Sequence, residues 1–456
     1  MKFPGAHFFI QYFIILLLAV GGSYFIPPMQ SPDEDQHIAK AYLLAQGDIL
    51  LTSPAGKMSG GYVDDGLRDF IQGHMQLSGR PDFRLSQEEK DRLKNLEWGD
   101  AQSRSFMEIP GTGFYLPLIY LPHAMAIKVG ELAQMSVHHT YYLTRIFVMA
   151  IAIALMLFAF SLHRPGILAL GILMLPMGLF QLLSPTLDGI TTSLSLVAIS
   201  LFFTFQSQPQ RSGIFYLLTI LLVLIATTRI HLAPLLLLLF IIALQERNRK
   251  FFATSLLATG FTLFWIVFSI KTTVDNRIPR DISSLEVLQY YIMRPVDFME
   301  VLFNTVSSKE VVGFYLQSFI GRLGWLDTNL TLWHYTALSA CIILFVFINA
   351  FSAPSKENSA IERYSLSGAA LLSILAIFMA LLIAWTPHPA TIVHGIQGRY
   401  FTVPFLLLAY ALHGTFDMRS RALCALSFAS RLLLSLFFIF SAYSLLTTLQ
   451  SRYSIY

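Results

Sequence analysis

Charged residues are scarce in this sequence. They make up 13% of the 456 residues, whereas hydrophobic residues make up 55%. Soluble globular domains carry about 25% charged residues, so a water-soluble fold is not expected. The formal net charge of +4 is scattered along the chain, without a dense Lys/Arg block or a basic strip interleaved with aromatic residues. Nucleic acid is therefore not an expected partner.

Cysteine is nearly absent, and so are the motifs of nucleotide-dependent and metal-dependent enzymes. The two cysteines, Cys341 and Cys424, show neither C-x-x-C spacing nor a neighbouring histidine cluster, so they predict neither a disulfide nor a metal site. The sequence has no P-loop, G-x-G-x-x-G, H-E-x-x-H or G-x-S-x-G motif in a usable context, so no nucleotide cofactor is expected. Without an internal repeat, a transporter built from inverted halves is disfavoured.

Long apolar runs dominate what is present. A helix needs about 17 to 25 apolar residues to cross the hydrocarbon core of a membrane. Apolar windows predict about eleven transmembrane helices, at residues 8–26, 141–162, 166–183, 189–206, 213–228, 230–245, 251–270, 332–352, 365–385, 399–413 and 430–449. The first run is expected to be retained, because Pro27 and Pro28 follow it without a small-x-small cleavage pattern. The expected fold class is an all-α polytopic membrane protein with a single membrane domain over residues 1–456.

Lys and Arg in the loops set the expected orientation. Loops with an excess of these residues are expected to be cytoplasmic, and the candidates are Arg247, Arg249 and Lys250; Lys356 and Arg363; and Arg419, Arg421 and Arg431. Counting back from these loops places segments 27–140 and 272–331 outside the cytoplasm. A further crossing by the apolar segment 114–129 would reverse this orientation, so we assign the segment to a helix that lies on or dips into the outer leaflet.

The two long outer segments are expected to carry short helices. Residues 27–112 hold 14 of the 27 acidic residues, so the first-loop segment 27–140 is expected to be a polar subdomain with interfacial helices. Within it, residues 86–98 predict a solvated helix opened by a capping box of Ser86 and Glu89. The second loop, 272–331, mixes amphipathic stretches with aromatic residues, as is typical of helices at a membrane interface.

The first candidate group for chemistry follows the first span directly, in the sequence Ser-Pro-Asp-Glu-Asp-Gln-His at residues 31–37. A capping box of Ser31 and Glu34 around Pro32 would explain part of this pattern without any function. Such a cap does not need Asp33 and His37, which would share one helix face at i, i+4. A carboxylate and an imidazole so placed could abstract a proton or hold a metal.

Three further candidate groups come from loops on the same expected side. Asp188 lies in a Ser-Pro-Thr-Leu-Asp-Gly turn, where it is either a helix cap or a site carboxylate. Arg229 and His231 lie between two apolar runs, either as interfacial residues or as a phosphate site. Gln397, Arg399 and Tyr400 lie in a segment with two glycines, Gly395 and Gly398, that allow close backbone approach, and they supply hydrogen-bond donors beside lipid.

These groups together resemble the bacterial predicted-membrane-protein family called domain of unknown function 2142. The residues that carry the resemblance are Pro32-Asp33-Glu34 with His37, the stretch Ala41 to Gly47, Ser184-Pro185 with Asp188, and Gln397-Gly398-Arg399-Tyr400-Phe401 with Pro404. They extend over most of the chain, and the last motif is the most specific. The family in turn resembles type C (GT-C) glycosyltransferases, which share an acidic motif in the first outer loop and many membrane helices.

The resemblance implies a membrane glycosyltransferase of the bacterial cytoplasmic (inner) membrane, with its active site facing outside. Such an enzyme takes a sugar from a polyprenyl-phosphate donor and transfers it, usually with inversion, to a cell-surface glycan or lipid. Asp33 or Glu34 would be the general base. Arg399, with Arg229 and His231, would neutralise the departing phosphate. Whether a divalent metal takes part stays open, because Asp33, His37 and Asp188 could be ligands, or His37 and Asp188 could orient Asp33.

Two other functions remain as alternatives. A transporter or flippase for lipid-linked saccharides of the cell envelope would need polar residues deep inside its spans, whereas the mid-span positions here are nearly all apolar. A non-catalytic assembly factor would not need acids and arginines that converge at one face. Only residues 450–456 follow the last expected span, so acceptor recognition is expected to fall to the two outer loops.

Overall fold

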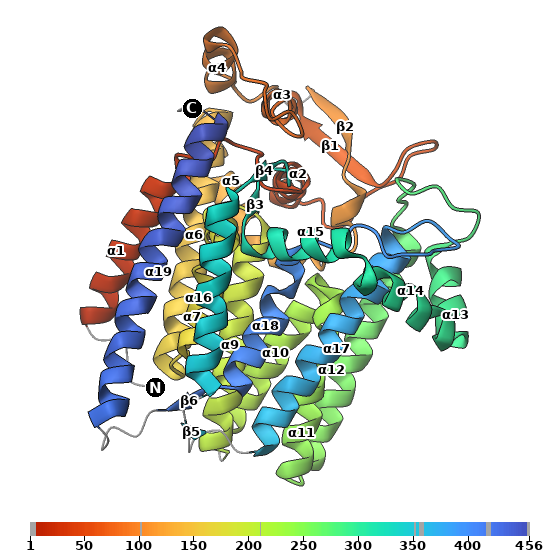
Figure 1. Ribbon diagram of the computed structural model, residues 1–456. Coiled ribbons are helices and arrows are strands. Elements are labelled where there is room, and N and C mark those ends of the chain that lie inside the picture. The colour runs from red at the N-terminus through yellow and green to blue at the C-terminus, as the bar shows by residue number, and fades with distance from the viewer. Residues whose placement is uncertain are drawn as a thin grey trace.

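The helices of this chain run side by side in a bundle, and shorter elements cover one end of it (Figure 1). The computed structural model describes residues 6–100, 103–209, 211–350, 353–354, 360–415 and 421–453. We call the end of the bundle that carries residues 27–136 and 273–331 the covered end. The N-terminus lies toward the opposite end of the bundle, and the C-terminus lies at the covered end.

Six helices among the described residues are long and apolar enough to cross a membrane. They are α6 (Val137–Leu162), α9 (Leu187–Ser207), α12 (Arg249–Thr272), α16 (Leu332–Ala350), α17 (Ala360–Ala384) and α19 (Arg421–Tyr453). Each one overlaps a span expected from the sequence. The chain is therefore an all-α, multi-pass membrane protein.

The other expected spans form shorter or broken helices, and proline explains two of the breaks. The elements are α1 (Ala6–Ser23), α7 (Ile167–Leu173), α8 (Pro176–Leu182), α10 (Ser212–Thr228), η3 (Ile230–Leu236), α11 (Leu237–Gln245), η4 (Gly398–Phe401) and α18 (Thr402–Ala411). Pro176 has no amide N–H and cannot continue α7, so the expected span 166–183 becomes two short helices. Pro234 lies inside η3, which is a 3₁₀ segment ahead of α11.

The first-loop subdomain consists of short helices around one antiparallel strand pair. Its elements are α2 (Glu34–Ala45), β1 (Gly60–Asp64), α3 (Asp65–Met75), α4 (Gln87–Lys94), β2 (Arg104–Glu108), η1 (Pro110–Thr112), η2 (Pro117–Tyr120) and α5 (Leu121–Leu132). Strands β1 and β2 pair with Gly60 opposite Glu108. Helix α5, from the segment 114–129 expected at the interface, packs along α6 and α2. Because α6 begins at Val137, the subdomain ends four residues before the expected boundary at 140.

The capping boxes differ from those expected. At α4 the Ser86 hydroxyl accepts from the Glu89 amide at 3.1 Å, but the Glu89 carboxylate pairs with Arg92 at 2.7 Å. This helix ends at Lys94 and is therefore shorter than expected. At α2 only the glutamate half of the box forms, because Glu34 accepts from the Ser31 amide at 3.0 Å and the Ser31 hydroxyl has no partner among the described residues. Capping alone therefore does not account for the 31–37 motif.

The second loop adds three helices and a short hairpin, whose two strands have two residues each, to the covered end. These elements are α13 (Ser284–Met293), α14 (Pro295–Ser307), α15 (Lys309–Ile320), β3 (Arg322–Leu323) and β4 (Thr328–Asn329). Helix α15 crosses the top of the bundle in Figure 1 and packs on η4. The pair β5 (Ala353–Pro354) and β6 (Gly414–Thr415) lies at the opposite end.

The basic loops used for orientation are partly described. Arg247 and Arg249 lie at the turn between α11 and α12, at the end of the bundle opposite to the covered end. Lys356 and Arg419 lie outside the described residues. The arrangement places the candidate segments 31–37 and 397–400 at the covered end.

Candidate functional site

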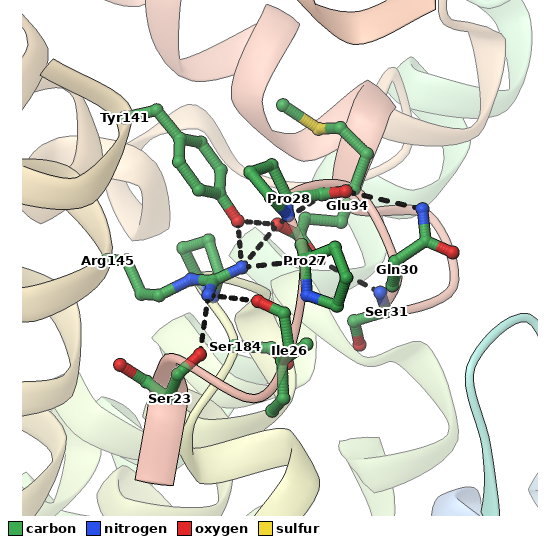
Figure 2. A network of polar contacts seen from close by, with 12 residues as sticks. Ser23, Ile26, Pro27, Pro28, Gln30, Ser31, Glu34, Tyr141, Arg145 and Ser184 are labelled. Carbon is green, nitrogen blue, oxygen red and sulfur yellow. Dashed lines mark hydrogen bonds and ion pairs between the residues drawn. The ribbon is translucent and has the colours of Figure 1, made fainter. Parts of the chain in front are cut away.

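A buried ion pair fixes the turn between α1 and α2. Arg145 of α6 donates to the carbonyl oxygens of Ser23 at 3.0 Å, Ile26 at 2.7 Å and Pro27 at 3.3 Å. These carbonyls belong to the end of α1 and the turn after it, where the helix itself offers no donors. The Arg145 side chain is fully buried, and one of its nitrogens lies 3.6 Å from a carboxylate oxygen of Glu34. Figure 2 shows Arg145 and Glu34 pointing toward one another across this turn.

Both carboxylate oxygens of Glu34 are occupied by this network. One accepts from the amide of Met29 at 3.1 Å and from the Tyr141 hydroxyl, and the other accepts from the amide of Ser31 at 3.0 Å. Tyr141 in turn accepts a hydrogen bond from Arg145. The Glu34 side chain has no exposed surface. Its position makes it a structural anchor of the turn.

Asp33, the neighbour of Glu34, is in contrast partly open to its surroundings. It caps α2 with a left-handed backbone, at φ 66°, and its side chain does not bond to the helix. Few residues other than glycine adopt this conformation, which costs of the order of 1 kcal/mol or more and tends to be kept at functional sites. The Asp33 side chain is 40% exposed, and one of its oxygens accepts from Arg399 at 2.8 Å.

Arg399 bridges two aspartates from different parts of the chain. Its Nη2 atom bonds to Asp33, and its Nη1 atom lies 3.1 Å from Oδ2 of Asp188. The Arg399 side chain is only 4% exposed and that of Asp188 15%, so this ion pair lies in a poorly solvated setting, where it is stronger than on a surface. Asp188 lies in the first turn of α9.

Arg229 completes a row of alternating charges. It follows the end of α10 and forms an ion pair with the other oxygen of Asp188. The ring of Tyr115 lies 5.4 Å from the Arg229 guanidinium, and its hydroxyl accepts from Arg229 at 3.4 Å. We call Asp33, Arg399, Asp188 and Arg229 the charged row. The structure thus brings together one or more residues from each of the four candidate groups of the sequence, whereas the Glu34 carboxylate lies in the separate network around Arg145.

Tight packing of α15 positions the arginine of the row. Gly398 donates its amide N–H to the Ser318 hydroxyl at 2.8 Å. A Cβ at Gly398 would lie 2.0 Å from the Phe319 nitrogen and 2.3 Å from the Tyr315 oxygen, so only glycine fits against α15. The next residue, Arg399, is directed from this contact toward Asp33 and Asp188.

The remaining candidate residues surround the row. His37 is buried and shares a hydrogen bond of 2.8 Å with the Tyr120 hydroxyl, and burial lowers the pKa of His37 to about 3, which keeps it neutral near pH 7. The rings of His231 and Tyr400 lie 6.0 Å apart. Gln397 has a buried side-chain oxygen with no hydrogen-bond partner among the described residues.

The site does not suit a divalent metal. Within the part of the chain that the structure describes, no group of three or more His, Cys, Asp or Glu side chains could hold a metal ion. Asp33 and Asp188 are paired with arginines, and His37 uses one ring nitrogen on Tyr120. A cation would have to compete with two guanidinium groups for the same carboxylates, so Asp33, His37 and Asp188, which the sequence left open as ligands, do not fit one in this arrangement.

An apolar cavity of about 360 Å³ ends at the charged row. Asp188, Arg229, His231, Arg399 and Tyr400 line its polar end. Most of its remaining wall is aliphatic or aromatic, with contributions from Ile15 of α1, Ile153, Met156, Leu157 and Phe160 of α6, Leu173 of α7 and Phe438 of α19. The cavity suits an amphiphile with an anionic group at one end and a hydrocarbon chain at the other.

Sequence reasoning missed the residues that support the row. No candidate group from the sequence includes Arg145, which lies near the start of the expected span 141–162; in the structure α6 begins eight residues before it and its side chain is fully buried. An arginine inside an apolar helix normally has a partner, and this was the available signal. Tyr115 and Tyr120 carry no comparable signal, because aromatic residues are common at membrane interfaces.

Comparison with known proteins agrees with the resemblance that the motifs indicate. Residues 16–409 match the family described as predicted membrane protein (DUF2142), so the match includes all four members of the charged row. None of the curated proteins and none of the solved structures that were compared matches the chain. The chain belongs to the predicted membrane protein family DUF2142.

Proposed function

We propose that this protein is an inverting membrane glycosyltransferase that moves a sugar from a polyprenyl-phosphate donor to a glycan or lipid acceptor. The observation that carries the proposal is the apolar cavity that ends at two arginines, beside the partly exposed carboxylate of Asp33. A lipid-linked sugar phosphate has the same order of parts: a hydrocarbon tail, an anionic phosphate and a polar sugar.

The cavity wall supports a donor that is embedded in the membrane. Ile15 of α1 is 39% exposed and Phe438 of α19 is 38% exposed, although both line the cavity. These side chains face the lipid-exposed side of the bundle, so a hydrocarbon chain could extend from the cavity into the bilayer. Arg229 and Arg399 are suited to the phosphate, because guanidinium groups bind phosphate oxygens with paired hydrogen bonds.

Asp33 is the general base of the proposed reaction, and Glu34 is its structural neighbour. The acceptor hydroxyl oxygen forms a bond to the anomeric carbon, and the bond between that carbon and the phosphate oxygen breaks. The hydroxyl proton passes to Asp33, and polyprenyl phosphate leaves with one additional negative charge. Proton uptake removes the charge of Asp33, so the charged row becomes more positive by one unit as the phosphate becomes more negative. Arg399 touches both Asp33 and the cavity, which suits it to this exchange.

The proposal includes five membrane crossings in addition to the six long helices. The shorter apolar elements α1, α7 with α8, α10, η3 with α11, and η4 with α18 would complete about eleven crossings of a GT-C-like fold. The covered end would face outside the bacterial cytoplasmic membrane, where the donor's sugar and the acceptor meet.

A transporter or assembly factor for lipid-linked saccharides is supported less well. A translocation path would need polar groups along the depth of the bundle. In α9, the buried hydroxyls of Thr191, Ser193 and Ser195 bond to carbonyls of their own helix and so do not offer free polar groups along its length. The ion pairs of the row all lie at the covered end, which favours chemistry at one membrane surface.

The test is transfer from a defined donor. Purified protein in detergent is incubated with a panel of polyprenyl-phosphate sugars and hydroxyl acceptors, and the release of polyprenyl phosphate is measured by mass spectrometry. Asp33→Asn should lower the rate by about 10²-fold or more, the usual contribution of a general base. Arg229→Ala should weaken binding of the donor, because a phosphate contact is lost.

A matched control separates chemistry from charge loss. Asp297 of α14 is 41% exposed and lies 4.0 Å from Arg294, so it is about as open as Asp33 and is also ion-paired. Asp297→Asn should leave transfer unchanged. Equal rates for Asp33→Asn and Asp297→Asn, or no turnover of any donor in the panel, would refute the proposed reaction.

A further inference from the structure

Helix α14 has three distinct faces. The side chains of Val301 and Thr305 are buried in the protein. Polar residues, among them Glu300, Asn304 and Ser307, are exposed on a second face. A third face is apolar and exposed: it consists of Val296 at 76%, Met299 at 55%, Phe303 at 68% and Val306 at 47% exposure. We call these four residues the apolar stripe.

The spacing of the apolar stripe confines it to one side of the helix. Its members follow one another at intervals of three, four and three residues, and each residue turns the helix by about 100°. The stripe therefore occupies a sector of about 80° that lies between the buried face and the polar face. The preceding helix α13 extends the exposed apolar surface with Ile292 at 66% and Met293 at 73% exposure.

The depth of these helices is given by their packing on α17. Val287 and Tyr291 of α13 and Val301 of α14 share a hydrophobic cluster with Ile377 and Leu381 of α17. A membrane crossing takes about 20 residues. Centred on the 25-residue helix α17, such a crossing extends over about residues 362–382 and includes both cluster residues. Helices α13 and α14 thus lie beside the last turns of α17, which a crossing of this length would place in the hydrocarbon region.

The stripe is continuous with the lipid-facing surface of the bundle. Leu372 and Leu375 of α17 are 44% and 40% exposed, in the middle of a helix that crosses the membrane. Figure 1 shows α13 and α14 beside the upper part of α17, at the edge of the bundle and not over its centre. Helices α13 and α14 therefore lie at the outer edge of the bundle beside α17, where lipid would surround them.

We propose that α13 and α14 form an amphipathic anchor that is inserted in the membrane leaflet at the covered end. The apolar stripe contacts acyl chains, and the face of Glu300 and Asn304 contacts water and headgroups. Helix α15 follows α14 after Ser308 and packs against Gly398, so the anchor ties the bilayer surface to the segment that carries Arg399. This inference does not depend on the reaction proposed above.

Collision accessibility of spin labels tests the anchor. Cys341 and Cys424 are replaced by serine, and single cysteines are introduced at Phe303 and at its neighbour Asn304. The labelled proteins are reconstituted in vesicles of phosphatidylethanolamine and phosphatidylglycerol, and the accessibilities to oxygen and to a water-soluble nickel chelate are measured. At 303 the ratio of oxygen to nickel accessibility should be several-fold higher than at 304, because oxygen concentrates in the acyl region.

A second pair keeps the test decisive if one variant does not fold. Val296→Cys lies two turns before Phe303 and Glu300→Cys lies one turn before Asn304, on the same two faces, so this pair should reproduce the contrast. Nickel accessibility at 303 and 296 as high as at 304 and 300 would show that the stripe faces water, which overturns the proposal. Protection of 303 and 296 from both reagents, together with a cross-linked dimer, would show that a second copy covers the stripe, and it would overturn the proposal as well.

Discussion

Two neighbouring acids, Asp33 and Glu34, have opposite surroundings. Glu34 is enclosed by Arg145, Tyr141 and two backbone amides, whereas the Asp33 side chain is 40% exposed and touches Arg399. The sequence pattern predicts that both residues lie in the site, but it cannot separate a partly exposed carboxylate from a buried anchor. That separation depends on Arg145, which is 111 positions from Glu34 along the chain. Contacts at such distances are not visible in local spacing.

The anchor role of Glu34 predicts strong coupling with Arg145. Arg145→Met leaves a buried carboxylate without its cation and should destabilise the protein by about 3–5 kcal/mol. The double variant Glu34→Gln/Arg145→Met should lose less than the sum of the single variants, because the second change removes the uncompensated charge. Thermal unfolding in detergent measures both quantities.

The surface pair of Glu89 and Arg92 provides the control for this cycle. Their side chains are 26% and 48% exposed, so Arg92→Met should cost no more than about 1 kcal/mol. If Arg145→Met were as mild as Arg92→Met, or if the effects at Glu34 and Arg145 were strictly additive, the buried pair would not hold the turn.

Asp35 predicts a dependence of stability on pH. Burial raises the pKa of Asp35 to about 7, and the charges of Asp33 and Glu34 add to the rise. The folded protein binds this proton more tightly than the unfolded chain, where the pKa of aspartate is about 3.9. The resulting stability is complete below about pH 4 and decreases as the pH rises to about 7.

Replacement of Asp35 by asparagine should remove this dependence. The gain in melting temperature of Asp35→Asn over the wild type should grow between pH 4 and pH 7 and stay constant above pH 8. One oxygen of Asp35 is buried without a hydrogen-bond partner among the described residues. Its replacement by the amide group of asparagine therefore breaks no hydrogen bond at that atom. A difference that does not change with pH would contradict the assignment.

At the scale of elements, the site forms where several helix ends meet. The end of α10, the start of α9, the N-cap of α2 and the segment η4 each contribute one member of the charged row. The sequence predicts that these segments lie on one side of the membrane, because the hydropathy pattern gives the number of crossings and the Lys/Arg content of the loops gives their orientation. It does not predict that α15 holds η4 in place, because the only sign of this close contact in the sequence is that residue 398 is a glycine.

The contact between α15 and η4 predicts a difference between two glycines. Gly398→Ala would place a methyl group 2.0 Å from the Phe319 nitrogen, so α15 or η4 must shift and Arg399 moves with it. Gly313 lies in α15 with no atom within 4 Å of its Cβ position. Gly313→Ala should be neutral or stabilise the protein by about 0.5–1 kcal/mol, because alanine favours helices.

Thermal unfolding and donor binding distinguish these glycine variants. Gly398→Ala should lower both the melting temperature and the affinity for a lipid phosphate, whereas Gly313→Ala should lower neither. Equal behaviour of the two variants would mean that the close packing at Gly398 does not position Arg399.

For the whole molecule, hydropathy predicts the fold class more accurately than it predicts where the individual helices begin and end. Every long described helix overlaps an expected span, because an uninterrupted run of about 20 apolar residues is typical of a segment that crosses a membrane. The breaks at Pro176 and in η3 depend on how neighbouring helices satisfy the freed backbone groups, which a window average does not report. The polar subdomain was expected from its acids, but its strand pair was not.

The orientation of the whole molecule predicts where two labels react. In a chain without Cys341 and Cys424, a cysteine at Glu88 of α4 should react with a membrane-impermeant maleimide on intact cells. A cysteine at Glu246, between α11 and α12, should react only after the membrane is permeabilised. The reverse pattern would place the charged row in the cytoplasm and remove the basis for transfer outside the cell.

The contacts of Arg145 also bear on how the protein is made. Its partner Ile26 is 119 residues earlier in the chain. At a synthesis rate of about 5–20 residues per second, the ribosome needs about 6–24 s to produce that interval. During this time α1 is already available to the membrane while the carbonyl groups at its end lack their donor. The turn that carries Asp33 is thus synthesised before its donor, and it can take its final shape only after α6 has followed.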